Sequence, residues 1–390
     1  MVKCQGAVLR GVGMDWEVCE IELDEPRAGE VLVRMVNASV CHTDDHFATG
    51  DCLPSPEMAD MMRAAGLQTP EMFPLLGGHE GAGIVEQVGP EVSDFRPGDH
   101  VGMSFIPACG KCRWCVSGQS YICDVGAQLF RKEMTTDGTV RRHLGTDALM
   151  ATTQLGTFAE YVVVSQNSLI KVDDSYPFHA VSLVSCGVTT GWGSATVSAG
   201  TRSGDTVVIV GLGGVGVGAV QGARNAGATN IVAVDPVAFK RDSAKQFGAT
   251  HTASWAHDAI ELVRELTLGV MADRVVLCAG VVHADLIPVG MMLTRKGGTC
   301  VLTGMTPVSE MSVPLIAVDM TNSVKQLKGT TYGEMNPRVS MPQLLSMYRA
   351  GSLNLDEMVT RRYALDEINE AIADMRDGRN IRGIIDFAGA

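Results

Sequence analysis

The sequence predicts an α/β protein with two domains, one rich in antiparallel strands and one built on a doubly wound parallel sheet. Short strands separated by turn residues fill the first part of the chain. A valine-rich strand then runs into a glycine loop and a helix of small residues, and strands and helices alternate from there on. At 390 residues the chain also exceeds the roughly 100–200 residues of an ordinary domain, so two cores are expected.

The N-terminal part is expected to form a compact antiparallel barrel. Its strand candidates combine β-branched and apolar residues between turn residues, and they are EVLVRMV, GAGIVEQVG, PGDHVGM and TFAEYVVV. From LKGTTYGE onward the chain holds two helical stretches, near Met341–Ala350 and Leu365–Arg376.

Four cysteines lie within the segment CGKCRWCVSGQSYIC: Cys109, Cys112, Cys115 and Cys123. Two, two and seven residues separate them, so one loop can wrap four thiolates around a single ion. Four thiolates leave no open position, which predicts a structural Zn²⁺ site. The alternatives are an iron–sulfur cluster, whose usual cysteine runs are spaced differently, and a nucleic-acid-binding zinc ribbon.

The formal net charge of −13 disfavours binding to nucleic acid or to an anionic membrane. No segment approaches the ~20 uninterrupted apolar residues of a membrane span, and the N-terminus lacks a signal-peptide pattern. We therefore expect a cytoplasmic protein. Its 11 cysteines are then thiols and metal ligands rather than disulfides.

The stretch GDTVVIVGLGGVGVGAVQGARNAGATNIVAVD predicts a strand at Thr206–Val210, a glycine loop, a helix and a second strand. A G-x-G-x-x-G pattern opens the helix, and Asp235 follows it by nineteen residues, which completes a Rossmann fingerprint. Cofactor-binding residues expected in the loop are Gly211, Gly213, Gly214, Val215 and Gly216. Asp235 would accept the adenosine ribose hydroxyls and repel a 2′-phosphate, which predicts NAD rather than NADP.

Three more segments carry metal-ligand residue types. VCHTDDHFATGD contains Cys41, LLGGHEGAGIVEQVGPEV contains His79, and VSCGVTTGWGSA contains Cys186. None of them is informative alone, because a single buried cysteine is usually an inert small hydrophobe. A single histidine is likewise more often a hydrogen-bonded core residue than a ligand.

Taken in order, CHTD, GHEGAG, the four-cysteine loop, CGxxTG and the glycine loop resemble the zinc-containing medium-chain alcohol dehydrogenases over nearly the whole chain. The resemblance implies a GroES-like catalytic domain over residues 1–187 and 329–390, which contains both zinc sites. It implies a Rossmann NAD-binding domain over residues 188–328.

The resemblance also implies a catalytic Zn²⁺ held by Cys41, His79 and Cys186, making two zinc ions per chain. Two thiolates and one imidazole leave a fourth position for water or alcohol. Related polyol dehydrogenases carry glutamate in place of the last cysteine, so Cys186 favours the alcohol branch.

The family pattern assigns roles to the neighbours of these ligands. It implies that Thr43 takes the proton of the substrate alcohol and that His46 passes it to solvent. Asp44 is implied to accept the ring N–H of His79. Glu80 is implied to lie behind the metal, where it ligates transiently; the alternative is an ordinary solvated carboxylate.

Further contacts are implied for the cofactor and the substrate. His42 stands where many relatives carry an arginine that contacts the pyrophosphate, and Lys240 matches a lysine beside the ribose. Arg382 matches an arginine that pairs with the pyrophosphate, the alternative being a surface arginine. Phe105 is implied to line the substrate pocket, although it is also suited to a core.

The segment DCLPSPEMADMMRAAGLQTPEMFP resembles an insertion relative to shorter family members. Ser55 and Pro56 predict the start of a helix, on which Met58, Met61 and Met62 share a face. One interpretation is a short surface helix packed on the barrel, with methionines as filler. The other is a lid over the cleft that slows exit of the cofactor.

The implied reaction is oxidation of a primary or secondary alcohol to an aldehyde or ketone by hydride transfer to NAD. Three segments resemble those of the nicotinoprotein branch of the family: the insertion, PVAFKR and DGRNIRG. Its members keep NAD bound between turnovers, pass electrons to an external acceptor, and are assayed with N,N-dimethyl-4-nitrosoaniline (NDMA). In actinobacteria they are associated with the redox carrier mycofactocin. A homo-oligomer is also implied.

Two alternative functions stay open at this point. One is a thiol-dependent formaldehyde dehydrogenase on the same scaffold, which requires a roomy, cationic pocket for a charged adduct. The other is a non-catalytic family member kept for binding or structure, for which the loss of catalytic ligands is the expected sign.

Overall fold

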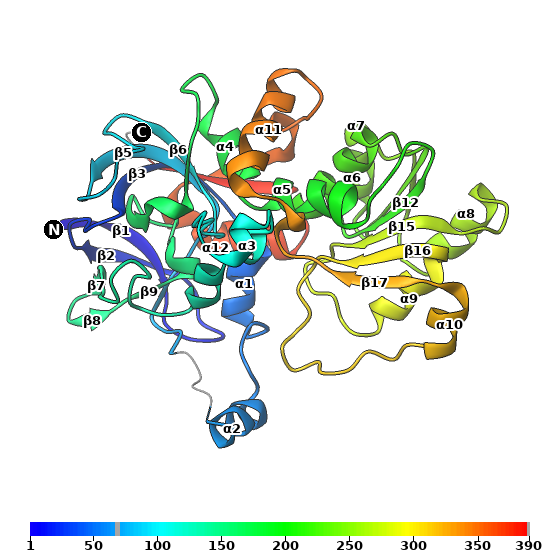
Figure 1. The fold of residues 1–390 in the computed structure, drawn as a ribbon, viewed down its shortest axis with the longest axis horizontal. Coiled ribbons are helices and arrows are strands. Elements are labelled where there is room, and N and C mark those ends of the chain that lie inside the picture. The colour runs from blue at the N-terminus through cyan, green and yellow to red at the C-terminus, as the bar shows by residue number, and fades with distance from the viewer. Residues whose placement is uncertain (67–70, 388–390) are drawn as a thin grey trace.

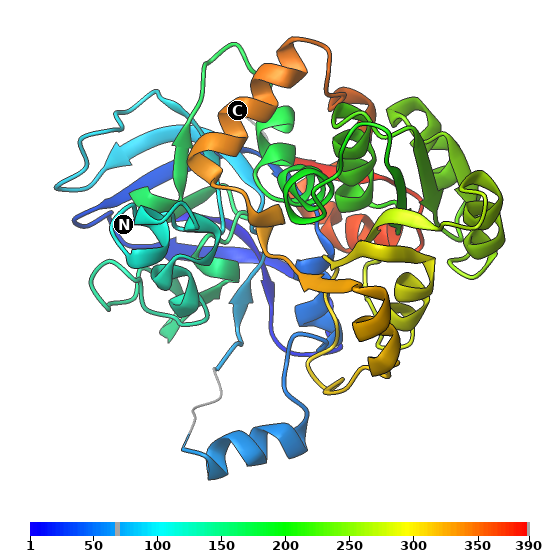
Figure 2. The same ribbon diagram turned by 45° about the vertical axis from the view of Figure 1, so that its right-hand side comes forward.

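The computed structural model describes residues 1–66 and 71–387, and in these the chain forms three β-sheets with helices around them (Figure 1). The strand-rich part, which contains both termini, lies on one side of the molecule, and a parallel sheet with its helices lies on the other (Figures 1 and 2). The predicted α/β class is confirmed. No helix within the described residues has both the length and the apolar composition needed to cross a bilayer.

The parallel sheet has six strands in the order β14-β13-β12-β15-β16-β17, and all its pairs are parallel. Its strands are β12 (Thr206–Val210), β13 (Asn230–Val234), β14 (His251–Ala253), β15 (Ala272–Leu277), β16 (Thr294–Leu302) and β17 (Gln326–Gly329). All five residues of β12 are buried, as expected for a valine-rich strand covered on both faces. The strand order reverses at β12, and doubly wound sheets bind dinucleotides at that point.

Five helices connect these strands: α6 (Gly214–Asn225), α7 (Ala238–Phe247), α8 (Asp258–Leu266), α9 (Leu286–Leu293) and α10 (Ala317–Ser323). The remaining helices belong to the rest of the chain and are α1 (His42–Thr49), α2 (Pro56–Ala64), α3 (Arg113–Val116), α4 (Phe178–Val184), α5 (Gly187–Gly193), α11 (Pro337–Arg349) and α12 (Ile368–Arg376). The two helical stretches predicted near the C-terminus correspond to α11 and α12 and are confirmed.

The strand-rich part consists of two sheets. One has the order β8-β7-β2-β1-β4-β9, and its strands are β1 (Val2–Leu9), β2 (Glu17–Leu23), β4 (Leu75–Leu76), β7 (Arg142–Leu144), β8 (Asp147–Ala148) and β9 (Met150–Ala151). The other has the order β11-β6-β5-β3-β19-β18, with β10 also paired to β3. Its strands are β3 (Glu30–Ser39), β5 (Gly81–Val88), β6 (His100–Met103), β10 (Tyr161–Ser165), β11 (Leu169–Lys171), β18 (Val359–Tyr363) and β19 (Arg382–Asp386).

The four strands predicted for this part are present as β3, β5, β6 and β10. These four strands pair antiparallel with one another, as predicted. Two pairs outside this set are parallel, β4 with β9 and β18 with β19. Between β18 and β19, helix α12 returns the chain to the end of the sheet at which β18 began, as a parallel connection requires.

Strand register brings three distant segments together at the ends of β3 and β5. Ala38 pairs with Gly81, and the Ser39 amide donates to the Glu80 carbonyl at 3.1 Å. The C-terminal strand reaches the same point, since the Val40 amide donates to the Gly383 carbonyl at 3.0 Å. The C-terminal segment therefore packs on the N-terminal strands. The boundaries at residues 187–188 and 328–329 stay a prediction.

The insertion forms a helix that projects from the molecule. Helix α2 begins as predicted, with the Ser55 hydroxyl accepting the Met58 amide at 3.2 Å and Pro56 in the first turn. None of its residues is buried, and α2 stands away from all three sheets (Figures 1 and 2). The interpretation of a helix packed on the barrel is therefore wrong, because the methionine face meets no core. Residues 67–70 of the insertion lie outside the described residues.

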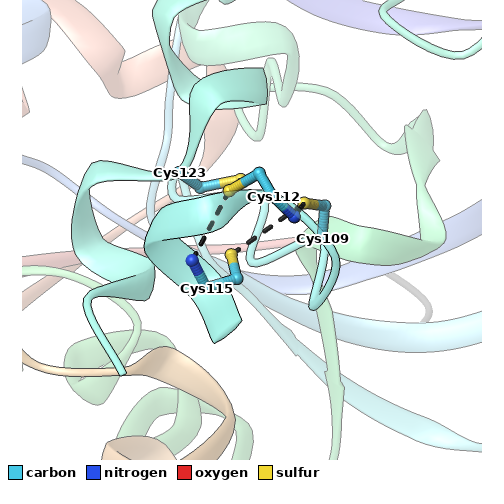
Figure 3. A group of neighbouring side chains, drawn as sticks. All are labelled: Cys109, Cys112, Cys115 and Cys123. Carbon is cyan, nitrogen blue, oxygen red and sulfur yellow. Dashed lines mark hydrogen bonds between the residues drawn. The ribbon is translucent and has the colours of Figure 1, made fainter. Parts of the chain in front are cut away.

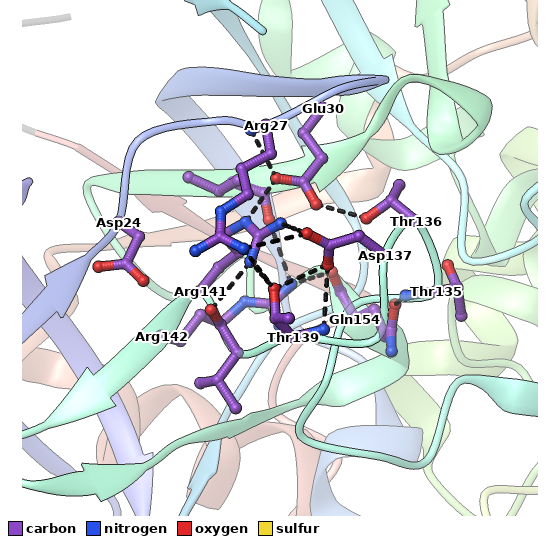
Figure 4. A network of polar contacts seen from close by, with 12 residues as sticks. Asp24, Arg27, Glu30, Thr135, Thr136, Asp137, Thr139, Arg141, Arg142 and Gln154 are labelled. Atoms are coloured by element: carbon purple, nitrogen blue, oxygen red, sulfur yellow. Dashed lines mark hydrogen bonds and ion pairs between the residues drawn. The ribbon is translucent and has the colours of Figure 1, made fainter. Parts of the chain in front are cut away.

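A buried ionic network joins the start of β3 to the segment before β7 (Figure 4). The Arg141 side chain donates to Glu30 at 2.7 Å, and both side chains are fully buried. Asp137 accepts from Arg141 at 2.5 Å, and Thr136 donates to Glu30. Together these contacts tie together parts of the chain more than a hundred residues apart.

Candidate metal and dinucleotide site

Four buried side chains of the types that bind metals meet where β3, β5 and α5 approach one another. Cys41 follows β3, His79 and Glu80 precede β5, and Cys186 precedes α5. Their ligand atoms all lie within 4.8 Å of one another. The structure thus brings together the three residues that the family pattern implies as ligands, with Glu80 beside them.

The hydrogen bonding of His79 fits a metal ligand. Its Nδ1 lies 2.9 Å from Asp44 Oδ2, and the other Asp44 oxygen accepts the Gly78 amide at 2.8 Å. This contact directs Nε2 away from the carboxylate, and Nε2 is buried with no hydrogen-bond partner among the described residues. A buried nitrogen without a partner is costly unless something else binds it.

The two thiols of the site interact strongly. A hydrogen bond from Cys186 holds the pKa of the Cys41 thiol well below its usual value, which favours the thiolate that metals bind. Thr43 Oγ1 lies 3.8 Å from Cys41 Sγ, so the threonine hydroxyl is next to the ligand set. Two sulfurs and one nitrogen form the donor set that zinc accepts in tetrahedral sites with one open position.

Glu80 is a buried, paired carboxylate rather than a solvated one. Its side chain is fully buried, and Oε2 accepts from Arg382 Nη2, so the interpretation as a solvated carboxylate is wrong. Burial raises the pKa of Glu80 to about 8. Its second oxygen, Oε1, has no hydrogen-bond partner. Arg382 is 4% exposed, so the alternative of a surface arginine is also wrong.

The glycine loop between β12 and α6 fits closely against its surroundings on two sides and is open on the third. Gly211 has φ +92°, and a Cβ there would lie 2.5 Å from the Ala279 nitrogen. A Cβ on Gly216 would lie 1.8 Å from the Gly211 oxygen, so these positions require glycine. A Cβ on Gly213 would meet nothing within 4 Å, which leaves space for a ligand against the backbone.

Arg382 also reaches this loop. A Cβ on Gly214 would lie 2.3 Å from the arginine Cδ and 2.6 Å from its Nη1. The guanidinium therefore packs at the N-terminus of α6, where unpaired amides and the helix dipole already favour an anion. Val215, the next residue of the loop, lines the same cavity.

The residues expected at the ribose line the same cavity, Asp235 directly after β13 and Lys240 in the first turn of α7. Asp235 is buried and accepts the Leu212 amide and the Val237 amide, each at 2.9 Å. Lys240 is buried and lines the same cavity. Arg241 donates to the backbone carbonyl of Asp235 at 2.7 Å, so its guanidinium lies next to that residue.

His42 lines the cavity across from this loop. Its ring packs on Gly280, where an added Cβ would lie 2.7 Å from the ring Cδ2. Burial lowers the pKa of His42, so the ring is less often charged than a free histidine. A neutral imidazole is a weaker anion ligand than the arginine of other family members.

One cavity of about 1330 Å³ contains both the ligand cluster and the glycine loop. Phe105 lines it and stacks edge-on against His79, with ring centroids 6.0 Å apart. The sequence patterns did not single out several other lining residues, which come from loops without a local signature: Leu129, Phe130, Thr153, Gly280, Met305, Thr306 and Tyr332. Only Gly280 had an indirect signal, because it follows a strand of the parallel sheet.

The described part of the insertion does not line this cavity. None of its described residues is among the cavity-lining residues. The interpretation as a lid therefore has no support from the described part of the segment. Residues 67–70 are outside that part.

The four-cysteine loop forms a second, separate cluster (Figure 3). Cys109 and Cys115 sulfurs are 3.9 Å apart, as are Cys112 and Cys123 sulfurs, and none is in a disulfide. Zinc–sulfur bonds of about 2.3 Å in a tetrahedron require sulfurs roughly 3.8 Å apart, so the spacing fits. The residues that follow the last cysteine continue into the cavity wall at Leu129.

Comparison with known proteins agrees with this geometry. Residues 27–174 match the family described as "Alcohol dehydrogenase GroES-like domain", and residues 214–350 match "Zinc-binding dehydrogenase". The chain therefore belongs to the zinc-binding alcohol dehydrogenases, and it is an oxidoreductase.

Individual relatives extend over nearly the full length. The chain is 46% identical to an NDMA-dependent alcohol dehydrogenase of Amycolatopsis methanolica, with 98% of this chain and 99% of the relative covered. It is 45% identical to alcohol dehydrogenase B of Mycobacterium tuberculosis, with 99% of each covered. The crystal structure of benzyl alcohol dehydrogenase from Acinetobacter calcoaceticus matches all of both chains with a TM-score of 0.86 at 27% identity.

Proposed function

We propose that this protein oxidises primary or secondary alcohols with Zn²⁺ and NAD, and that the substrate meets both in the single cavity. The observation that carries the proposal is the convergence of Cys41, His79 and Cys186 beside the glycine loop, with His79 Nε2 buried and without a partner. Cys41, His79 and Cys186 would hold a Zn²⁺ that would supply a Lewis acid for the alcohol oxygen, and NAD in the glycine loop would supply the hydride acceptor.

The chain's own residues have separate tasks in this scheme. Asp44 would orient His79, because its carboxylate lies 2.9 Å from Nδ1 and so leaves Nε2 for the metal. Thr43 receives the proton of the alcohol, and His46, which lines the same cavity, passes that proton towards solvent. Glu80 and Arg382 lie behind the ligands, and Arg382 extends from there to the place for the cofactor pyrophosphate.

Three further residues would hold the remaining parts of NAD. Asp235 and Lys240 would bind the adenosine ribose, because both are buried and line the same cavity, Asp235 after β13 and Lys240 in the first turn of α7. His42 would contact the pyrophosphate from the opposite wall. The carboxylate of Asp235 disfavours a 2′-phosphate by charge repulsion, which supports NAD over NADP.

The substrate end of the cavity favours an apolar alcohol over a charged thiol adduct. Around Phe105 the wall contains Leu129 and Phe130. Among the cavity-lining residues that the structure describes, lysine and arginine occur only at Lys240, Arg376 and Arg382. Two of these adjoin the cofactor loop, and Arg376 is paired with Asp45 of α1. A thiol-dependent formaldehyde dehydrogenase would need a cation at the substrate end.

The finer parts of the proposal follow the nicotinoprotein branch. The NDMA-dependent relative and the burial of Asp235, Lys240 and Arg382 support an NAD that stays bound while an external acceptor removes the electrons. A second, structural Zn²⁺ in the four-cysteine loop is part of the proposal, supported by its sulfur spacing. Homo-oligomerisation and a cytoplasmic location stay predictions.

The test combines a census of bound groups with turnover measurements on the purified protein. Zinc is counted by elemental analysis and nucleotide by absorbance after denaturation. Alcohol oxidation is then measured with NDMA and no added NAD, and with added NAD alone. Two zinc ions, one nucleotide and NDMA-coupled turnover are expected. Turnover that needs added NAD would reject the bound cofactor, while a single zinc confined to the four-cysteine loop would reject the catalytic assignment.

A further inference from the structure

The stem of the insertion, rather than its helix, lies next to the proposed reaction site. Asp51 comes two residues after α1, and its carbonyl accepts the Val308 amide at 3.0 Å. The next residue, Cys52, places its sulfur 3.1 Å from the Met305 sulfur. Both partners lie in the segment that follows β16 in the parallel-sheet part of the chain, so two neighbouring contacts anchor this short stem to that segment.

Anchoring of the stem places the Asp51 carboxylate against the ring of His46. Its Oδ2 lies 3.2 Å from His46 Nδ1 and accepts the Thr49 hydroxyl at 2.7 Å. On the other edge of the ring, Nε2 lies 2.9 Å from the Gly280 carbonyl oxygen. The His46 side chain is 3% exposed, so these two oxygens decide where its protons lie.

The two ring nitrogens of His46 lie towards different surroundings. Gly280 lines the cavity together with His46, so Nε2 is on the cavity side of the ring. Asp51 is not among the cavity-lining residues and its side chain is 27% exposed, so the buried Nδ1 meets a carboxylate that reaches solvent. The ring thus connects the reaction cavity to the outside through a carboxylate.

Both neighbours of the ring are acceptors, and this selects its protonation states. A neutral imidazole carries one N–H, and the carboxylate draws it to Nδ1, which leaves Nε2 to accept a proton from the cavity. After that transfer both nitrogens donate, to Asp51 and to Gly280. The surroundings therefore satisfy the ring fully only in the charged state that a proton relay passes through.

Resting on the proposed alcohol oxidation, we propose that Asp51 is a positioning residue for proton release: it fixes the tautomer of His46 and stabilises the imidazolium that forms when the alcohol loses its proton. Protons and electrons balance in this step. The alcohol O–H proton moves through Thr43 to His46 Nε2, the Nδ1 proton leaves towards solvent, and the hydride goes to NAD.

A double-mutant cycle measures this role. Asp51→Asn offers an amide N–H to Nδ1 and so favours the wrong tautomer. It should lower the rate of the first reduction of bound NAD by alcohol about 10- to 100-fold, with alcohol KM, zinc and nucleotide content unchanged. In the His46→Gln background the same change should have no further effect. Asp60→Asn, in the exposed α2 of the same insertion, is the matched control and should leave the rate unchanged.

A second measurement reads the contact without turnover. In protein labelled with ¹⁵N histidine, His46 of the wild type should show a protonated-type signal at Nδ1 and an unprotonated-type signal at Nε2, and Asp51→Asn should shift Nδ1 to the unprotonated type. Thr49→Val removes only the hydroxyl bound to Asp51, so it tests the same contact should Asp51→Asn fail to fold. It should lower the rate by about twofold to fivefold, less than the loss of the carboxylate.

The outcomes separate the two proposals. Rates within twofold of wild type in Asp51→Asn, or additive losses in the double variant, would overturn the role of Asp51. A wild-type protein that shows the ring signals yet oxidises no alcohol would instead reject the proposed function, and with it the catalytic meaning of the contact. Coupled losses together with the Nδ1 shift would establish the role.

Discussion

Two buried glutamate–arginine pairs in this protein differ in how completely they are satisfied. Around Glu30 and Arg141, one glutamate oxygen accepts from Thr136 and the other from Arg141 and the Arg27 amide (Figure 4). The guanidinium donates further to Asp137 and to the Val140 carbonyl. Around Glu80 and Arg382, by contrast, Glu80 Oε1 and Arg382 Nε have no partner.

This difference distinguishes the Glu30–Arg141 pair, which is structural, from the Glu80–Arg382 pair, which belongs to the candidate ligand-binding site. Leaving a buried polar atom without a partner costs about 1–3 kcal/mol, and more if it is charged. A closed network needs nothing more, so the first pair holds the fold together. The second pair adjoins two thiols and a histidine whose Nε2 also lacks a partner. Unpaired atoms gathered beside metal-binding side chains indicate a place for a ligand.

The largest effect is expected at the open site, from Cys186→Ala. Loss of one sulfur ligand should lower the turnover of alcohol by about 10³-fold or more, equivalent to about 4 kcal/mol of transition-state stabilisation. Zinc content should fall from two to one per chain, while bound nucleotide is retained. Cys300→Ala, which removes a buried thiol of the parallel sheet, is the control. Near-normal turnover in Cys186→Ala would show that the metal is held elsewhere.

At the closed network the expected effect is on stability alone. Glu30→Gln leaves the Arg141 charge buried beside a neutral amide and should lower the free energy of unfolding by about 3–5 kcal/mol. Chemical denaturation measures this loss. Turnover of the folded variant should stay within about twofold of wild type, since no member of the pair lines the cavity. A folded variant with strongly reduced turnover would remove the distinction between the two pairs.

A smaller effect is expected at the ribose end of the cavity. Asp235→Ser removes the charge that repels a 2′-phosphate and leaves Arg241 beside it. The preference for NAD over NADP should fall about 10- to 100-fold, or about 1.4–2.7 kcal/mol. Titration of each nucleotide into protein freed of its cofactor gives the ratio. An unchanged ratio would place the discriminating contact on another residue.

The smallest effect is expected from Glu80→Gln, which tests the Glu80–Arg382 pair against the Glu30–Arg141 pair. At about pH 9, where Glu80 is ionised, Glu80→Gln gives Arg382 a neutral partner in place of a charged one, and the cofactor pyrophosphate should then compensate the arginine charge. NAD should therefore raise the melting temperature of Glu80→Gln by about 2–4 °C more than it raises that of the wild type. The same measurement on Glu30→Gln should show no such excess. Equal shifts in all three proteins would mean that Arg382 does not meet the pyrophosphate.

Features encoded within short segments could be predicted from the sequence. The loop from Gly211 to Gly216 requires glycine because of its own backbone geometry and close approaches. The start of α2 at Ser55 follows from a capping hydroxyl three residues from its partner amide. The ligand set of Cys41, His79 and Cys186 came from the family pattern, since its members are far apart in the chain.

What could not be predicted depends on contacts between distant residues. Glu80 and Arg382 are 302 positions apart, so the sequence alone left open whether either was exposed. The methionine face of α2 suited a core, yet whether a core was available depended on the course of the whole insertion. Asp51 gave no signal because its partners, the ring of His46 and the amide of Val308, are defined only once the parts of the chain meet.

The four-cysteine loop has a consequence for how substrate preference diversifies. With the proposed Zn²⁺ bound, its four sulfurs would fix the path of the chain on one side, while Ile122, Leu129 and Phe130 on the same stretch line the cavity. These side chains can be exchanged for larger or smaller ones without moving a reacting group, because the anchors rather than the side chains set the backbone. Such a replaceable wall lets one catalytic centre serve alcohols of many shapes.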